Sequence, residues 1–392
     1  MRHEPIDRLL ITGGLCVLEA GETQADVLVA GERIADIVRP RSHSAARVID
    51  ASGCWVVPGF VDLHAHGGGG ADFADGTIGA AKTVLDFHAA HGTTRVVASL
   101  VPAKLDHLRR TLGILSTSHL SGLLGVHLEG PYVSPSKHGA LALPYLRSPN
   151  RDEFRRLVAG FEDKIRIVTL APELPDAADL LVTIQDVGAI PAIGHTAATY
   201  EQALAAMDQG ARHITHLWNA MSGVHHRSPG VVGAALFDRR ATIELIADGV
   251  HVHPSVVRFV IEDLAGRGQL GRLSLVSDAI RAAGLSDGPS TIGNLHVAVR
   301  GGVASLQDGT LAGSTVPLDA ALRNVVHFAD IPLSRAIALV TRNPAAALGI
   351  ADLGELRPGA YADVVLLDVK LNVRTTIRSG EIVFESALAA RA

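Results

Sequence analysis

The sequence lacks three features that would each define a class of protein. It has only two cysteines, Cys16 and Cys54, in neither a zinc motif nor a disulfide framework, as expected of a reduced cytosolic protein. Its net charge is −5 and its lysines and arginines are scattered, so we expect no nucleic-acid partner. No apolar run approaches bilayer length, and charged residues interrupt the segment 1–18. We therefore expect a cytoplasmic protein without a membrane span or signal peptide.

The chain is large enough for one large barrel and a smaller companion domain. It has 392 residues, of which 47% are hydrophobic. Short β-rich runs separated by turn residues fill the first 57 residues, and this texture returns from residue 354 onward. We predict that 1–57 and 354–392 pair into one small β-sandwich domain with antiparallel strands, and that 58–353 form the barrel domain.

Between these ends, β runs alternate with helical patterns. Such alternation predicts a parallel sheet, and about eight units favour an α/β fold of the (β/α)₈ TIM type over a doubly wound sheet, because the barrel closes at eight. The helix after the sixth strand is the least clear, since a Ser-Pro-Gly sequence at 228–230 interrupts the pattern. The Gly301-Gly302 turn indicates an inserted hairpin, followed by helical segments to Leu348. The predicted strands are 57–63, 94–100, 123–128, 165–170, 189–194, 213–217, 242–247 and 273–277, and the clearest helices are 78–90, 105–116, 199–209 and 254–265.

Histidines and carboxylates stand at the ends of these strands. His64 and His66 are two residues apart on a strand, so both side chains face the same way and can bind one metal ion. In a barrel, the chemistry lies at the carboxyl ends of the strands. Taken singly, each residue has an ordinary explanation as a solvated carboxylate or a hydrogen-bonded core histidine, but their joint placement favours one site. The remaining members are Glu129, His195, His216 and Asp278, after the third, fifth, sixth and eighth strands.

Imidazoles together with a carboxylate suit a borderline divalent cation such as zinc or ferrous iron. Such a cation lowers the pKa of a water and polarises a carbonyl oxygen, which supports hydrolysis of an amide or a related bond. Asp278 can then take the proton of the water and return it to the departing amine. The residues leave open that Asp278 is instead a third metal ligand, and the two roles can coexist.

Longer motifs carry a resemblance to a known family. The segments 58–66 (PGFVDLHAH), 341–345 (TRNPA) and 354–363 (GELRPGAYAD) resemble the amidohydrolase superfamily. Within it, 127–131 (HLEGP), 194–196 (GHT) and 215–221 (THLWNAM) resemble the deacetylases of amino-sugar phosphates. These motifs are specific and the likeness covers nearly the whole chain. Many members of the superfamily bridge their metals with a carboxylated lysine, whereas these deacetylases use a glutamate, and Glu129 stands in that motif.

The resemblance implies a metal held by Glu129, His195 and His216, with Asp278 as the acid/base residue. Some relatives replace the His-x-His pair and bind one metal, but His64 and His66 are intact here, so one or two cations per subunit are expected. The implied reaction converts N-acetylglucosamine-6-phosphate into glucosamine-6-phosphate and acetate. The alternatives are N-acetylgalactosamine-6-phosphate, an unphosphorylated N-acetyl sugar or another small N-acyl compound. A non-catalytic scaffold is disfavoured, because such proteins typically lose ligands or the acid/base residue.

Further residues are expected to contact an amino-sugar phosphate. The guanidinium of Arg227 could pair with a phosphate dianion, although by pattern alone it is an ordinary surface arginine. The resemblance assigns it to the sugar phosphate, sometimes from a neighbouring subunit, which favours a homodimer. It also makes His251 a phosphate or sugar contact, while the pattern alone equally allows a cap of the next helix. The resemblance implies further substrate contacts at Asn219, Ala220, Leu311, Ala312 and Gly313.

The loop after Glu129 departs from the family pattern. Relatives usually present Gly-Ala-His or Gly-Ala-Gln there, and the polar side chain contacts the substrate, whereas this chain has Gly139-Ala140-Leu141. We expect Ala140 and Leu141 to contact the substrate, but a leucine side chain cannot make that hydrogen bond. Either His138 or another loop residue compensates, or the substrate differs. Four other histidines suit structural roles better than metal ligation: His88, His91, His213 and His253.

Overall fold

The computed structural model describes residues 8–40, 42–43 and 45–387. Residues 1–7 and 388–392, at the two ends of the predicted small β domain, lie outside the described residues. Residues 1–7 are also the start of the segment 1–18, in which no signal peptide is expected. The chain divides into two compact units, one of residues 1–61, 86–95 and 318–392 and one of residues 62–85 and 96–317. The domain borders predicted at 57/58 and 353/354 stay a prediction. No helix in the described part of the chain is long and apolar enough to cross a membrane.

Two sheets share a core in the first unit. One has the order β5-β4-β1-β6, and the other, β23-β22-β21-β7-β2-β3, joins strands from both ends of the chain. Side chains of both sheets, including Ile11, Val27, Val364 and Ile377, pack in one cluster, which confirms the predicted β-sandwich. The strands are β1 (Arg8–Thr12), β2 (Leu15–Leu18), β3 (Gly21–Gln24), β4 (Asp26–Ala30), β5 (Arg33–Val38), β6 (Arg47–Asp50), β7 (Trp55–Pro58), β21 (Val364–Leu367), β22 (Val373–Arg378) and β23 (Glu381–Glu385).

The expectation of purely antiparallel pairing in this unit is wrong. Strand β1 pairs with β6, and β2 pairs with β7, in parallel. Parallel neighbours need a crossover connection of about a dozen residues or more, and the intervening strands β3, β4 and β5 supply that length. The same unit contains helices α8 (Leu318–Ala329), α9 (Leu333–Val340) and α10 (Arg342–Ala347), which match the helical segments expected up to Leu348.

Eight strands form one sheet in the order β17-β16-β15-β14-β13-β12-β11-β8. The ring closes where Ala65 pairs in parallel with Ala279 and the amide of Asp278 donates to the carbonyl of His64 at 2.8 Å. This confirms the (β/α)₈ barrel. The strands are nearly continuous apolar runs because parallel strands are buried on both faces. They are β8 (Phe60–Ala65), β11 (Thr93–Leu100), β12 (Leu123–Glu129), β13 (Ile165–Leu170), β14 (Ile190–Ile193), β15 (His213–Ile214), β16 (Thr242–Ile246) and β17 (Leu273–Val276).

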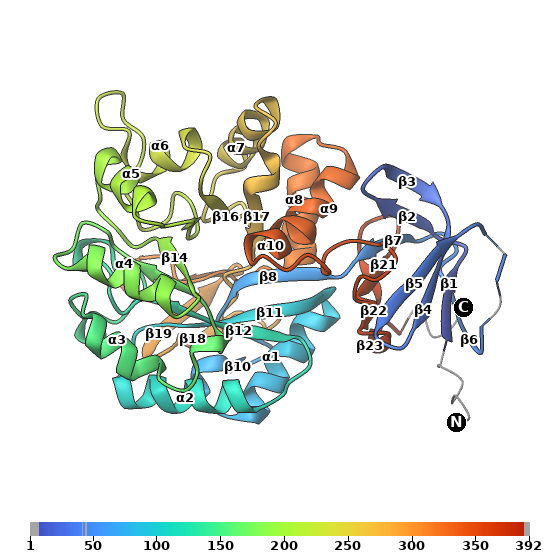
Figure 1. Cartoon of the computed structure of the whole chain (residues 1–392), viewed down its shortest axis with the longest axis horizontal. Coiled ribbons are helices and arrows are strands. Elements are labelled where there is room, and N and C mark those ends of the chain that lie inside the picture. The colour runs from blue at the N-terminus through green and yellow to red at the C-terminus, as the bar shows by residue number, and fades with distance from the viewer. Residues whose placement is uncertain (1–7, 41, 44, 388–392) are drawn as a thin grey trace. The chain divides into compact units, whose positions relative to one another are not determined.

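Helices connect these strands, and α2, α3 and α4 follow one another around the outside of the sheet (Figure 1). The Ser-Pro-Gly sequence at 228–230 starts a helix, because α6 begins at Gly230 with Pro229 as its cap. Helix α5 begins with a capping box between Thr199 and Gln202. The bounds are α1 (Ile78–Ala90), α2 (Leu105–Thr117), α3 (Arg151–Val158), α4 (Ala177–Asp186), α5 (Tyr200–Asp208), α6 (Gly230–Phe237) and α7 (Pro254–Gly266).

An antiparallel insertion follows the last barrel strand. It consists of β18 (Gly288–Ile292), β19 (Leu295–Arg300) and β20 (Val303–Ser305), and the predicted turn at Gly301-Gly302 joins the last two. Its apolar side chains pack with Leu141, Ile280 and Ala312. The insertion therefore supports two segments that were predicted to contact the substrate. Two shorter strands, β9 (Gly67–Gly68) and β10 (Ala71–Asp72), pair after β8.

Candidate metal centre and active site

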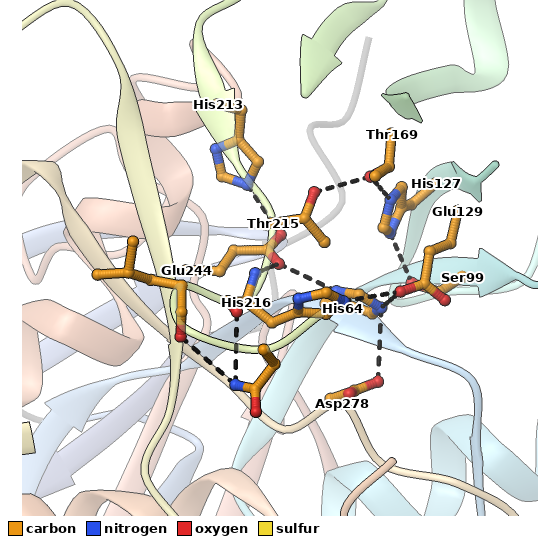
Figure 2. Close-up of polar contacts among 12 residues, drawn as sticks. His64, Ser99, His127, Glu129, Thr169, His213, Thr215, His216, Glu244 and Asp278 are labelled. Carbon is orange, nitrogen blue, oxygen red and sulfur yellow. Dashed lines mark hydrogen bonds and ion pairs between the residues drawn. The ribbon is translucent and has the colours of Figure 1, made fainter. Parts of the chain in front are cut away.

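The residues predicted at the strand ends come together in one buried place. Figure 2 shows four of them: His64, Glu129, His216 and Asp278. Glu129 is the last residue of β12, and His64 is the penultimate residue of β8. His195, His216 and Asp278 follow their strands with φ angles of 47°, 28° and 47°. Left-handed backbone is costly for residues other than glycine, and such residues gather at functional sites. The chain thus turns sharply at each strand end and directs the side chain inward.

Glu129, His195 and His216 form the first cluster. The Oε1 atom of Glu129 lies 3.0 Å from Nε2 of His195 and 3.0 Å from Nε2 of His216. The two Nε2 atoms are 3.1 Å apart. All three residues are buried, and their ligand atoms are close enough to share one ion.

His64 and His66 form a second cluster around the same glutamate. Their Nε2 atoms are 3.2 Å apart. Glu129 places Oε2 3.3 Å from Nε2 of His66 and Oε1 3.5 Å from Nε2 of His64. These ligand atoms too are close enough to share one ion. Glu129 therefore belongs to both clusters, and the structure brings all five predicted ligands together.

The hydrogen bonds of the outer ring nitrogens show that these residues fit a cation. Nδ1 of His195 faces the carbonyl of Lys137 at 2.9 Å, and Nδ1 of His66 faces the carbonyl of Ser99 at 3.2 Å. Nδ1 of His64 faces Oε2 of Glu244 at 3.0 Å. Carbonyl and carboxylate oxygens only accept, so Nδ1 carries the proton in each ring. With Nδ1 protonated, Nε2 is the nitrogen that can offer its lone pair to a cation in the clusters, as in metal-ligating histidines.

The charges of the centre also favour a cation. Burial lowers the pKa of His66, but Asp278 and Glu129 outweigh it and raise that pKa to about 10. Burial raises the pKa of Glu129, but His64 and His195 bring it well below its usual value. Ionised carboxylates therefore dominate the local field, and in a buried position they need positive partners.

Asp278 lies beside both clusters. Its Oδ1 is 3.1 Å from Nε2 of His66 and 3.5 Å from Nε2 of His64. Burial raises the pKa of Asp278, but His64 and His66 outweigh this effect, and the net result is a pKa below its usual value. The carboxylate is therefore ionised and can accept a proton. This position suits both alternatives predicted for Asp278, acid/base residue or third ligand. Figure 2 shows that Glu129 and Asp278 both point toward His64.

A cavity of about 370 Å³ opens onto this centre. Its wall combines His66, Glu129, His195, His216 and Asp278 with predicted substrate contacts. His64 does not line it. The predicted contacts in its wall are Ala140, Leu141, Asn219, Ala220, His251, Leu311, Ala312 and Gly313.

Arg227 does not line this cavity in its own chain. It lies on an exposed turn, where its Nη1 is 2.6 Å from Nε2 of His226. The predicted role of Arg227 in phosphate binding is therefore unsupported within a single chain, and the roles of all the substrate-side residues stay predictions.

Leu141 packs its side chain away from water, with 3% of its surface exposed. It joins the apolar cluster of the insertion. His138 turns back on this loop, because its Nδ1 donates to the carbonyl of Leu141 at 3.1 Å. Ser136 and Lys137 line the cavity, whereas His138 is not among the residues in its wall. A compensating polar contact would therefore come from Ser136 or Lys137.

His251 is held by two hydrogen bonds. Nδ1 donates to Oδ2 of Asp248 at 2.7 Å, and Nε2 donates to the carbonyl of Ala312 at 2.9 Å. Burial lowers the pKa of His251, but Asp248 outweighs it and raises the pKa above its usual value. His251 thus ties the 311–313 segment to its own loop as a cation. The alternative that His251 caps a helix is wrong, since His253 accepts from the amide of Ser255 and caps α7.

Two buried carboxylates near the centre were not predicted from the sequence. Glu244 interrupts the apolar strand β16, and the carboxylate of Asp248, which follows that strand, is 4% exposed. A lone carboxylate within an apolar parallel strand is a usable signal, because charged side chains are almost never buried without a partner. Two of the histidines assigned structural roles have partners outside the clusters: His91 pairs with Asp319, and His213 pairs with Glu244.

Known proteins are similar to this chain in sequence and in structure. The model of the amidohydrolase family matches residues 55–383. An N-acetylglucosamine-6-phosphate deacetylase of Vibrio furnissii is 34% identical over 96% of this chain and 95% of that protein. An N-acetylgalactosamine-6-phosphate deacetylase of Escherichia coli O157:H7 is 38% identical over 83% of this chain and 86% of that protein. A mutant N-acetyl-D-glucosamine-6-phosphate deacetylase of Mycobacterium smegmatis, solved in complex with N-acetyl-D-glucosamine-6-phosphate, is 36% identical with a TM-score of 0.91, covering 96% of this chain and 99% of that one. The chain therefore belongs to the amidohydrolase family.

Proposed function

We propose that the protein is a metal-dependent amide hydrolase that converts N-acetylglucosamine-6-phosphate into glucosamine-6-phosphate and acetate. The observation that carries this proposal is the pair of clusters sharing Glu129, with Asp278 beside them in the wall of one cavity. Relatives of this activity, similar over nearly the whole chain, support it.

In this proposal, Glu129, His195 and His216 hold a zinc or ferrous ion, and His64 and His66 with Glu129 provide for a second. When bound, such an ion supplies Lewis-acid chemistry: it polarises the acetyl carbonyl and makes a water more acidic. The hydrogen bonds at Nδ1 of His64, His66 and His195 orient these rings for that task.

Asp278 moves the proton. Its ionised carboxylate takes a proton as water adds to the acetyl carbonyl, and it returns that proton to the nitrogen as the C–N bond breaks. Its backbone is fixed on both sides, because its amide donates to His64 and its carbonyl accepts from Ser314, each at 2.8 Å. This keeps the carboxylate in place through both transfers.

N-acetylgalactosamine-6-phosphate is the second candidate substrate. The relative of that name is 38% identical to this chain, and Leu141 stands where the family loop usually presents a polar side chain. The two sugars differ only in the configuration of the C4 hydroxyl, so a changed hydrogen-bond partner in this loop is the kind of difference that discriminates them. Side-by-side assays of both phosphates and of unphosphorylated N-acetylglucosamine rank the candidates.

Acetate release from N-acetylglucosamine-6-phosphate tests the proposal directly. We expect protein stripped with a chelator to release no acetate, and Zn²⁺ or Fe²⁺ to restore release, because the buried clusters need a cation for Lewis-acid chemistry. Calcium is the control, since it prefers all-oxygen sites. Full activity of the stripped protein, or no acetate with any of these metals, would contradict the proposal.

We expect Arg227→Ala to raise KM for the phosphorylated sugar about 10- to 100-fold, the loss typical of a charge-assisted hydrogen bond. Activity on unphosphorylated N-acetylglucosamine should be unchanged. Arg258→Ala, at an exposed arginine of α7, is the control. Equal damage to both substrates would remove Arg227 from phosphate binding.

We also propose a cytoplasmic homodimer in which Arg227 serves the neighbouring site. This is supported by the absence of Arg227 from the cavity wall of its own chain. Mixing inactive Asp278→Asn subunits with Arg227→Ala subunits should then restore a low KM in part of the sites. In a mixed dimer, the Asp278→Asn subunit supplies its intact Arg227 to the site of the Arg227→Ala subunit, whose Asp278 is intact. No restoration on mixing would place Arg227 in its own site or in none.

A further inference from the structure

Glu244 is a fully buried carboxylate that neither belongs to the two clusters nor takes part in the proposed proton transfer. It is the middle residue of β16, one of the eight barrel strands. Its Oε2 is 3.0 Å from Nδ1 of His64 and 3.1 Å from the amide nitrogen of His216. Its Oε1 is 2.8 Å from Nε2 of His213 (Figure 2). This one carboxylate thus accepts hydrogen bonds from three residues of other segments of the chain.

The contact with His64 decides which nitrogen of that ring faces the clusters. Oε2 of Glu244 accepts from the amide nitrogen of His216, and the same oxygen faces Nδ1 of His64, so it is the acceptor in both contacts. Nδ1 of His64 must therefore carry a proton. Nε2 is left to face His66 and Glu129 with its lone pair whenever the ring is neutral.

Glu244 is itself held firmly in position. His213 contacts its Oε1, and Nδ1 of His213 lies 2.6 Å from the hydroxyl of Thr242, two residues before Glu244 on the same strand. The position of the carboxylate is therefore set by β15 and β16 together. The Nδ1 atom of His64 faces this carboxylate, whereas the Nδ1 atoms of His66 and His195 face backbone carbonyls.

We propose that Glu244 is a positioning residue that makes the His64, His66 and Glu129 cluster competent to bind a second divalent cation. It does so by locking His64 in the orientation that presents Nε2 to that cluster. The inference rests on the proposed function only in taking the cation to be divalent. Glu244 does not line the cavity, so it acts through His64 and touches no substrate.

Two substitutions separate position from charge. Glu244→Gln keeps an oxygen acceptor for His64 and His216, and His213 can accept from the amide by changing its tautomer, so the position is kept and the charge is lost. Glu244→Asp keeps the charge but withdraws the carboxylate by one methylene, out of reach of His64. Thr169→Val is the matched control, because Thr169 is a buried barrel residue whose hydroxyl contacts His127 and Thr215, neither of which is a candidate ligand.

The measurement is Zn²⁺ binding to stripped protein, by equilibrium dialysis with elemental analysis and by calorimetry. We expect two Zn²⁺ per subunit in the wild type, in Glu244→Gln and in Thr169→Val. Glu244→Asp should bind the second Zn²⁺ about 10- to 100-fold more weakly, the usual cost of losing an outer-shell partner. The first Zn²⁺ should lose less affinity, because Glu244 contacts only the backbone amide of His216 and not its ring. In zinc-loaded wild-type protein, nitrogen NMR should place the His64 proton on Nδ1, and this measurement needs no variant to fold.

Several results would overturn the inference. Loss of the second Zn²⁺ in Glu244→Gln but not in Glu244→Asp would mean that charge rather than position acts. Equal weakening of both Zn²⁺ ions in Glu244→Asp would make Glu244 a support of the whole centre. A single Zn²⁺ in the wild type at saturation, or a His64 proton on Nε2, would also refute it. None of these results tests the proposed deacetylation, which is tested separately by acetate release.

Discussion

Asp278→Asn should nearly abolish acetate release while leaving the content of bound metal unchanged. An amide of the same size keeps the backbone contacts of residue 278 to His64 and Ser314, but it can no longer accept and return a proton. General acid-base groups typically contribute about 10²- to 10⁴-fold to a rate, and we expect a fall of kcat in this range with a much smaller change of KM. Steady-state kinetics and elemental analysis on one preparation give both quantities.

The metal content separates the two alternatives predicted for Asp278. A carboxylate that serves only as the acid/base residue can be replaced without loss of metal, whereas a third ligand cannot. Asp308→Asn is the control, because Asp308 is exposed on a turn, where its carboxylate accepts from the amide of Thr310. Unchanged turnover in Asp278→Asn would remove this residue from the mechanism.

Glu129→Gln should have the largest effect of any single substitution, because it removes the ligand common to both clusters. Its two oxygens contact His195 and His216 on one side and His66 on the other. We expect Zn²⁺ content to fall from its full value toward zero. Turnover should fall by at least about 10³-fold, since metal ions contribute several kcal/mol of transition-state stabilisation.

Elemental analysis after dialysis checks the metal content, and circular dichroism checks that the variant is folded. Glu262→Gln is the control, because Glu262 is a half-exposed glutamate of α7 paired with Arg258. Full occupancy in Glu129→Gln would show that the histidines alone hold the cations, and the bridging role would then be wrong. Loss of one cation with the other retained would assign Glu129 to a single cluster.

The barrel could be predicted closely because its strands carry a strong signal. Parallel strands covered on both faces read as apolar runs, and β13, Ile165–Leu170, has the predicted bounds. The signal is weakest at β15, where only His213 and Ile214 form the strand although 213–217 were predicted. There the chain leaves the sheet early, as the positive φ angles of His216 and Trp218 show. Local pattern does not reveal such a turn, because a positive φ is uncommon for any residue other than glycine.

Contacts between distant residues explain what the sequence could not show. Nothing local links Glu244 to His64, which is 180 residues away, or Asp248 to Ser314, whose hydroxyl donates to it at 2.9 Å. Leu141 looked like a lost substrate contact, but its side chain also packs against an insertion that begins far along the chain, at Gly288. Periodicity reports which face of an element is apolar, and it does not report which element that face meets.

The sequence by itself determined the order of the barrel strands, the β-sandwich built from both ends of the chain, and the residues that end the strands. These follow from hydrophobic pattern and turn chemistry, which act over a few residues. Only the tertiary structure decided that Glu129 is shared by two clusters, that His251 is tied to Ala312, and that Glu244 orients His64. Such contacts depend on how a closed sheet brings distant strand ends within hydrogen-bonding distance, and side-chain geometry at about 3 Å is set by that closure.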